Sequence, residues 1–211
     1  MDKISEKLHL LSINKCPNKN SVDIMEHLYT LYNYSKECDS IFETGVRGCV
    51  SSWAFLKGLL DSNINGNKKI LFMNDIDVCD INELLDCGKN FDIELKYEWK
   101  NNLLLDLPQN FDITFIDTWH VYGQLKRELE KFSKLTNKYI IMHDTTVDEI
   151  YGETLRIGWD PIIQSQQTGI PVSEITKGLW PAVEEFIYNN PEWYIKERYT
   201  NNNGLTILAR K

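Results

Sequence analysis

Acidic side chains and glycines recur in this chain directly after short apolar runs. The first such run is followed by Glu43-Thr-Gly45-Val-Arg47-Gly48, in which two glycines stand three residues apart. Glycine lets the backbone approach a ligand closely, and a helix that begins after such a turn aims its free N–H groups at that ligand. Glu43 is then placed to accept a hydrogen bond from a hydroxyl or an amino group. The pattern indicates a site for a nucleoside-containing cofactor.

The next four apolar runs also end in polar residues, at Asp75, Glu98, Asp117 and His143-Asp144. Taken singly, each is most simply a helix cap or part of a solvated loop. As a series they indicate a ligand, because ligands of open α/β sheets bind outside the carboxyl ends of the strands. Asp75 is placed to accept hydrogen bonds from both hydroxyls of a ribose.

Strands and helices alternate around these residues. The predicted strands are 40–43, 69–74, 93–97, 111–117 and 139–142, and the predicted helices are 23–36, 49–60, 80–87 and 121–135. Ser21 or Asp23 is the predicted cap of the first helix, and Asp80 is the predicted cap of the third. Alternation at this spacing implies right-handed crossovers and a parallel sheet with helices on both faces.

The alternation stops after Asp144. Residues 145–177 are predicted to be a long irregular segment of the kind that forms a lid or binding loop. A helix at 180–188 follows, and strands at 193–199 and 205–209 form a predicted hairpin. The predicted domains are an N-terminal helical extension, 1–38, whose first twenty residues are weakly patterned, and a main domain, 39–211, that contains the lid.

Composition narrows the classes of function. The chain has 211 residues and a formal net charge of -8, which argues against a nucleic-acid or anionic-membrane partner. Its five cysteines form no C-x-x-C pair, as is typical of reduced thiols inside a cell. No apolar run is long enough to span a membrane, and the polar N-terminus lacks the apolar core of a signal peptide. These features predict a soluble, cytoplasmic protein.

A resemblance to a known family is carried by Glu-Thr-Gly-Val-Arg-Gly at 43–48, Asp75, Phe-Asp-Ile-Thr-Phe-Ile-Asp-Thr-Trp-His at 111–120 and Ile-Ile-Met-His-Asp at 140–144. Together these segments resemble class I S-adenosylmethionine-dependent methyltransferases. Within that group, the Asp-x-x-His-x-Tyr run that begins at Asp117 is similar to small-molecule O-methyltransferases of the catechol and sugar or macrolide type, and to cephalosporin-hydroxylase-like proteins. The resemblance implies a Rossmann-like, doubly wound α/β fold with a mostly parallel seven-stranded sheet whose last strand is antiparallel.

The same resemblance implies which residues hold the cofactor S-adenosylmethionine: Glu43, Gly45, Arg47, Gly48, Ser51, Asp75 and Asp117. Glu43 and the two glycines would hold the methionine part, with Ser51 or Ser52 nearby, and Asp75 would hold the ribose. Arg47 has two interpretations, a bond to a ligand carboxylate and an ion pair with Glu43.

Residues implied to activate the acceptor follow the later strands. Asp117 and Asp144 match metal-binding positions of the metal-dependent O-methyltransferases, and carboxylate ligands suit Mg²⁺. His120 lies where the catechol-type enzymes have a lysine base, and a neutral imidazole can take a proton from a hydroxyl. His143 has three interpretations: a metal ligand, a second base and a hydrogen-bonded strand-end residue.

The implied function is S-adenosylmethionine-dependent O-methylation of a hydroxyl on a sugar or glycan-like small molecule. One alternative is an NAD-binding Rossmann oxidoreductase, which is disfavoured because Glu43 ends the first strand where a dinucleotide fold needs glycine. The other is an inactive methyltransferase-like scaffold, which is disfavoured by the joint presence of Asp117, His120 and Asp144. A homodimer is compatible with the predicted edge strands and lid.

Two further sets of residues carry expectations about packing. Aromatic rings in or beside the lid suit either stacking on a sugar ring or ordinary packing: Tyr151, Trp159 and Trp180. Charged residues on the helix at 121–135 are predicted to form a solvated face: Glu128, Glu130 and Lys131. Trp53, Phe55 and Leu59 have helical spacing and are predicted to be core residues.

Overall fold

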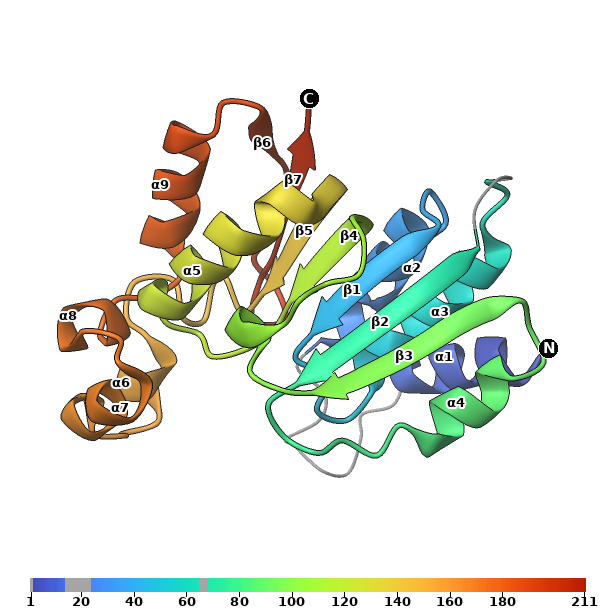
Figure 1. Ribbon diagram of the computed structural model, residues 1–211, viewed down its shortest axis with the longest axis horizontal. Coiled ribbons are helices and arrows are strands. Elements are labelled where there is room, and N and C mark those ends of the chain that lie inside the picture. The colour runs from blue at the N-terminus through green and yellow to red at the C-terminus, as the bar shows by residue number, and fades with distance from the viewer. Residues whose placement is uncertain (1, 14–23, 65–67) are drawn as a thin grey trace. The chain divides into compact units, whose positions relative to one another are not determined.

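The computed structural model describes residues 2–13, 24–64 and 68–211, and its elements are labelled in Figure 1. The strands are β1 (Ser40–Thr44), β2 (Lys69–Asp75), β3 (Ile93–Trp99), β4 (Phe111–Ile116), β5 (Thr136–His143), β6 (Trp193–Tyr199) and β7 (Leu205–Arg210). The α-helices are α1 (Lys3–Ile13), α2 (Leu28–Ser35), α3 (Val50–Asp61), α4 (Asn82–Gly88), α5 (Tyr122–Phe132), α6 (Glu153–Arg156), α7 (Pro161–Thr168), α8 (Val172–Ile175) and α9 (Trp180–Asn189). Single turns of 3-10 helix are η1 (Met25–His27), η2 (Asn102–Leu104) and η3 (Ser133–Leu135).

The seven strands follow the order β3-β2-β1-β4-β5-β7-β6. Strand β1 is parallel to β2 and β4, and β2 is parallel to β3. Strand β7 is antiparallel to both β5 and β6. This order confirms the predicted α/β fold with an antiparallel last strand, and it confirms the predicted hairpin. Within this sheet the chain forms two units, Met1–Ile116 and Asp117–Lys211.

Unit 1 is built on the buried strands β1 and β2. The rings of Phe42, Phe72 and Phe111 pack together with centroids 5.8 to 6.0 Å apart. Helices α2 and α3 lie behind these strands in Figure 1. On α3 the three residues predicted to be core, Trp53, Phe55 and Leu59, are at most 3% exposed, so that prediction is confirmed.

The N-terminal segment, which is weakly patterned in sequence and belongs to the predicted helical extension, contains α1. The Asp2 carboxylate accepts hydrogen bonds from the backbone N–H groups of Ile4 and Ser5, which caps the helix. Ile4 and Leu8, four residues apart, are both buried. Thus a single capping acid and a narrow apolar stripe suffice for a helix that packs on α3.

Two predicted caps have different outcomes. Ser21 and Asp23, proposed caps for the helix at 23–36, lie outside the described residues, while the helix itself is present as η1 and α2. Helix α4 begins with Ile81 at its N-cap, so Asp80 is not the cap that was predicted. Asp80 stands one position before this N-cap, and its side chain accepts a hydrogen bond from the Asn82 backbone N–H.

The segment 145–177 of unit 2 is more regular than predicted, because it contains α6, α7 and α8. Figure 1 shows these three short helices gathered in one region, in orange. Gly152 is the N-cap of α6, Pro161 is in the first turn of α7, and Gly169 ends α7 at a φ of 73°. Glycine and proline therefore mark helix ends here, whereas the prediction took them as marks of an irregular loop.

Helix α5 corrects the prediction that its charged residues form a solvated face. Glu130 is exposed, as expected of a solvated face, but Glu128 is 0% exposed. The Glu128 carboxylate accepts hydrogen bonds from Thr118 Oγ1 at 2.6 Å and Gln124 Nε2 at 2.8 Å. It therefore anchors Thr118 within the segment that carries Asp117 and His120. Among the helices of the described ranges, none has the length and apolar character needed to cross a membrane.

Candidate active site

In unit 1, the turn between β1 and α3 adopts a backbone conformation that favours glycine. Gly45 has a φ of 91°, a region that side chains with a Cβ rarely adopt, and its N–H donates to Asn74 O. Among the described residues, a Cβ on Gly48 would have one neighbour within 4 Å, Val50 Cγ2 at 3.9 Å. The described residues therefore leave space beside the Gly48 backbone, and the close approach of a ligand there stays a prediction.

Asp75, the predicted ribose ligand, lies against this same turn. Its Oδ2 accepts hydrogen bonds from the backbone N–H groups of Val46 (2.8 Å) and Arg47 (2.9 Å), and its Oδ1 accepts one from Asp77 (2.9 Å). A carboxylate offers about four lone-pair positions, so three are already used. About one position is therefore left for a ligand, and the contact of Asp75 with a ribose stays a prediction.

Glu43 and Ser51 also meet in unit 1. Glu43 is 0% exposed, and Ser51 Oγ donates a hydrogen bond to its Oε1. Burial, together with the Glu43 charge, raises the pKa of the neighbouring Cys49 thiol to about 12. Arg47 is exposed, and it joins the turn through its backbone N–H.

Polar side chains from three parts of the sequence tie the strand ends of unit 1 together. Asn102 donates to Thr44 Oγ1, which donates to Asn74 Oδ1, both at 3.0 Å. All three residues are at most 6% exposed. Because buried polar groups need partners, this chain of hydrogen bonds fixes the ends of β1 and β2.

In unit 2, the residues predicted to activate an acceptor converge. His120 Nε2 lies 3.2 Å from both Asp117 Oδ1 and Asp144 Oδ2. His143 Nδ1 lies 3.2 Å from Asp144 Oδ2 and 3.5 Å from Asp117 Oδ1. We call these four residues the His-Asp cluster. His143 is 1% and Asp144 3% exposed, so two members are shielded from water.

A buried acid behind His120 escaped the sequence analysis. Asp148 is 0% exposed and accepts two hydrogen bonds from Arg156, at 2.6 and 2.8 Å. Its Oδ2 is also 3.2 Å from His120 Nδ1. Asp148 lies in the segment predicted to be irregular. Its spacing of four residues from Asp144 is the sequence feature that could have indicated a shared role.

The charges of unit 2 set the protonation of both rings. Burial by itself lowers the pKa of His120, but Asp117, Asp148 and Asp144 raise it more, so the pKa lies well above its ordinary value. Burial also lowers the pKa of His143, but the carboxylates of Asp117 and Asp144 raise it more, so the pKa rises to about 10. Despite its own burial, the Asp117 carboxyl has a lowered pKa because of His143 and His120. The protein's own charges therefore favour imidazolium rings, whereas a base must be neutral.

A divalent cation fits the donor atoms of this cluster. Ligand atoms of Asp117, His120 and Asp144 all lie within 4.8 Å of one another. Asp144 Oδ1 is buried, and no group of the described residues donates a hydrogen bond to it. A buried carboxylate oxygen of this kind is typical of a metal ligand.

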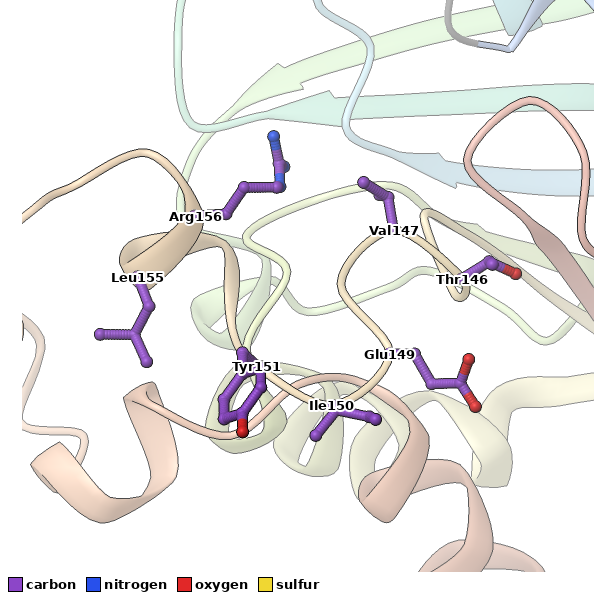
Figure 2. Close-up of a pocket in the computed structure, with 7 residues that line it drawn as sticks. All are labelled: Thr146, Val147, Glu149, Ile150, Tyr151, Leu155 and Arg156. Atoms are coloured by element: carbon purple, nitrogen blue, oxygen red, sulfur yellow. The ribbon is translucent and has the colours of Figure 1, made fainter.

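A cavity of about 450 Å³ lies beside the helix α6 in unit 2. Figure 2 shows its lining, Thr146, Val147, Glu149, Ile150, Tyr151, Leu155 and Arg156. Ile150 and Tyr151 are 67% and 69% exposed. Trp159 lines a second cavity of about 370 Å³. Trp180 instead packs under the Arg198 guanidinium, 3.5 Å from the ring centre.

Several solved methyltransferase structures match nearly the whole chain. The O-methyltransferase TomG of Streptomyces achromogenes, in complex with S-adenosylmethionine, has a TM-score of 0.59 and 13% identity, over 100% of this chain and 91% of its own. An O-methyltransferase of Bacillus cereus in complex with S-adenosylhomocysteine has a TM-score of 0.56 and 15% identity, over 99% of this chain and 90% of its own. The N-methyltransferase NodS of Bradyrhizobium japonicum WM9 has a TM-score of 0.54 and 12% identity, over 99% of both chains.

The chain has the class I methyltransferase fold. At these identities the likeness is one of fold. No family model matches the sequence, and no curated protein sequence matches it. Placed on this methyltransferase fold, Glu43 and Asp75 stand at the carboxyl ends of β1 and β2, Asp117 follows β4, and His143 ends β5.

Proposed function

We propose that this chain is an S-adenosylmethionine-dependent O-methyltransferase that acts on a hydroxyl of a sugar or glycan-like small molecule. The observation that carries the proposal is the His-Asp cluster, formed by residues that follow two strands of a methyltransferase fold. The O-methyltransferases of similar fold bind S-adenosylmethionine or S-adenosylhomocysteine in their own structures, which supports the same donor here.

The donor is proposed to bind at the turn of unit 1. Gly45 and Gly48 leave space beside the backbone, and Glu43, with Ser51 beside it, would accept a hydrogen bond from the amino group of the methionine part. The exposed Arg47 guanidinium would pair with the carboxylate of that part. Asp75 would accept a hydrogen bond from the ribose.

The acceptor is proposed to lose its proton at the His-Asp cluster. As the acceptor oxygen bonds to the methyl carbon, the carbon–sulfur bond of the donor breaks, and a methyl ether, S-adenosylhomocysteine and a proton are formed. Mg²⁺ held by Asp117 and Asp144 would lower the pKa of a hydroxyl bound to it. His120 is the base that the sequence predicts, and His143 is the next candidate; either ring must be neutral to accept a proton.

The 450 Å³ cavity is the proposed acceptor pocket. Its volume is in the range of small-molecule sites. The exposed Tyr151 ring offers an apolar face against which a sugar ring can stack, and Ile150 and Leu155 extend this face. Arg156, on the rim, links the pocket to Asp148 and so to the His-Asp cluster.

Isothermal titration calorimetry with S-adenosylmethionine tests the donor. We expect binding to the full chain, and no heat with or without Mg²⁺ would contradict the proposal. Thermal-shift measurements with NAD test the oxidoreductase alternative. A ligand raises the Tm of a protein that binds it, so a rise in Tm with NAD would favour that alternative.

A labelled-donor assay with nucleotide sugars and free glycosides, run with Mg²⁺ and with EDTA, tests the acceptor and the metal. For an accepted substrate, Tyr151→Ala should raise KM at least about 10-fold through lost stacking, with donor affinity unchanged. The matched control is Tyr188→Ala, because Tyr188 is 88% exposed on α9 and lines neither cavity. Equal effects of the two substitutions would remove the pocket from the proposal.

A further inference from the structure

Both histidines of the cluster have their outer ring nitrogen against a group that can only accept a hydrogen bond. His120 Nδ1 lies 3.2 Å from the Asp148 carboxylate, and His143 Nε2 lies 3.1 Å from the backbone oxygen of Asn202. For His143, a proton on Nε2 leaves a lone pair on Nδ1, which faces Asp117 and Asp144. For His120, the hydrogen bond is made by Nε2 to Asp117 Oδ1, and Nδ1 has no hydrogen-bond partner among the described residues. A metal bound at His120 Nε2 would move the ring proton to Nδ1, on the side of Asp148.

The four inner atoms form a closed ring in which nitrogen and oxygen alternate. Going round from Asp117 Oδ1 through His120 Nε2, Asp144 Oδ2 and His143 Nδ1, the sides are 3.2, 3.2, 3.2 and 3.5 Å. Neighbouring ligands of one metal ion with bonds of about 2.1 Å stand roughly 3.0 to 3.4 Å apart. Three of the observed sides lie in that range and the fourth, 3.5 Å, is slightly longer, so a dication held by all four atoms would take the place of the protons on the two rings.

Two further observations point to a ligand at this ring. Asp144 has a φ of 58°, a backbone conformation that costs energy in a residue other than glycine and that clusters at functional sites. Its Oδ1 is buried and receives no hydrogen bond from the described residues. Behind His120, the Asp148–Arg156 pair supplies the carboxylate that commonly orients a metal-binding imidazole.

We infer that Asp117, His120, His143 and Asp144 together bind one first-row transition-metal dication in preference to Mg²⁺. Imidazole nitrogen suits zinc, iron, cobalt and nickel, whereas Mg²⁺ prefers oxygen ligands and retains much of its water. His120 is then a ligand of the metal and not a free base. The inference rests on the acceptor site of the proposed function and changes two of its details, because it replaces Mg²⁺ and makes both histidines metal ligands where the proposal has a base. Metal binding is measured without any methyl transfer.

Calorimetry of the EDTA-treated full chain with Co²⁺, Zn²⁺ and Mg²⁺ in separate runs tests this. We expect one Co²⁺ or Zn²⁺ per chain, bound at least about 100-fold more tightly than Mg²⁺. His120→Ala should weaken Co²⁺ at least about 10-fold and change Mg²⁺ affinity little. The matched control is His9→Ala, because His9 is exposed on α1. Comparable affinities for Mg²⁺ and Co²⁺, no metal binding, or an unchanged His120→Ala variant would overturn the inference.

A second measurement does not depend on the folding of a cluster variant. Pulsed electron paramagnetic resonance of His9→Ala protein with one equivalent of Cu²⁺ should show modulation from the remote nitrogens of coordinated imidazoles. Their absence would overturn the inference. The two proposals can fail separately. Binding of Co²⁺ without binding of S-adenosylmethionine would contradict only the proposed function, and binding of S-adenosylmethionine without binding of Co²⁺ would contradict only the metal site.

Discussion

Replacing Asp148 by asparagine removes the buried negative charge that stands between His120 and Arg156. Asp148 is 0% exposed, and its oxygens accept hydrogen bonds from Arg156 Nε at 2.6 Å and Nη2 at 2.8 Å. Asparagine has nearly the same shape and keeps one acceptor oxygen. Asp148→Asn therefore removes charge while creating no cavity, and we expect a loss of stability that is mainly electrostatic.

The size of this loss follows from the exposure of Arg156. Removing one partner of a buried ion pair costs about 3 to 5 kcal/mol when the remaining charge stays buried. The Arg156 side chain is 42% exposed, so its charge regains water after the substitution. This lowers the expected cost to about 2 to 3 kcal/mol. For a chain of this length the corresponding fall in Tm is about 5 to 10 °C.

Thermal unfolding at pH 7, followed by circular dichroism with EDTA present, measures this fall. The matched control is Glu153→Gln, because Glu153 also pairs with Arg156 but at 3.7 Å and with a 22% exposed side chain. That longer pair should contribute less than about 1 kcal/mol. A change in Tm below about 1 °C for Asp148→Asn, or an equal fall for Glu153→Gln, would refute the reasoning.

The glycines and one thiol give further predictions. Gly45→Ala should lower the free energy of unfolding, measured in urea, by about 1 to 2 kcal/mol because the φ of Gly45 is 91°. Gly48→Ala should change it by less than about 0.5 kcal/mol, because its Cβ would stand 3.9 Å from Val50 Cγ2. Equal costs for the two variants would contradict this. Gly204→Ala would place Cβ 2.3 Å from Thr146 Oγ1 at a φ of 97°, so a Tm loss equivalent to at least about 2 kcal/mol is expected, and an unchanged Tm would count against it. With a pKa raised to about 12 by burial and Glu43, Cys49 stays protonated until the pH rises far above 8. Iodoacetamide at pH 8 should therefore modify it at least about 100-fold more slowly in native than in unfolded chain, as mass spectrometry would show; similar rates would exclude the raised pKa.

The strand ends were predictable because local signals coincide there. Each apolar run that stops at an acid became a strand, and the parallel order brought Asp117, His120 and Asp144 together as the strand-end rule predicts. The glycine spacing at 45–48 likewise predicted a turn, and Gly45 has the positive φ that such a turn requires. These features depend on short stretches of sequence.

The remaining features depend on partners far away in the sequence. A glutamate on a helix is usually solvated, and only the hydrogen bonds from Thr118 and Gln124 reveal why Glu128 is buried. Asp148 resembles any loop acid until the fold of residues 145–177 brings Arg156 and His120 to it. The glycines and prolines of that segment are equally common in loops and at helix ends, so their pattern did not reveal three short helices.

The hydrogen bonds that Asp75 accepts from the turn also set how strictly the sugar of the donor is checked. A site that binds both hydroxyls of a ribose rejects an analogue that lacks either one, because a buried polar group is then left without a partner. Asp75 already accepts from Val46, Arg47 and Asp77, so it can recognise about one hydroxyl. We expect competition binding with 2′-deoxy and 3′-deoxy S-adenosylhomocysteine to differ, one analogue losing affinity and the other keeping it. In the proposed donor site, this carboxylate would therefore tolerate the loss of one ribose hydroxyl and not the loss of the other.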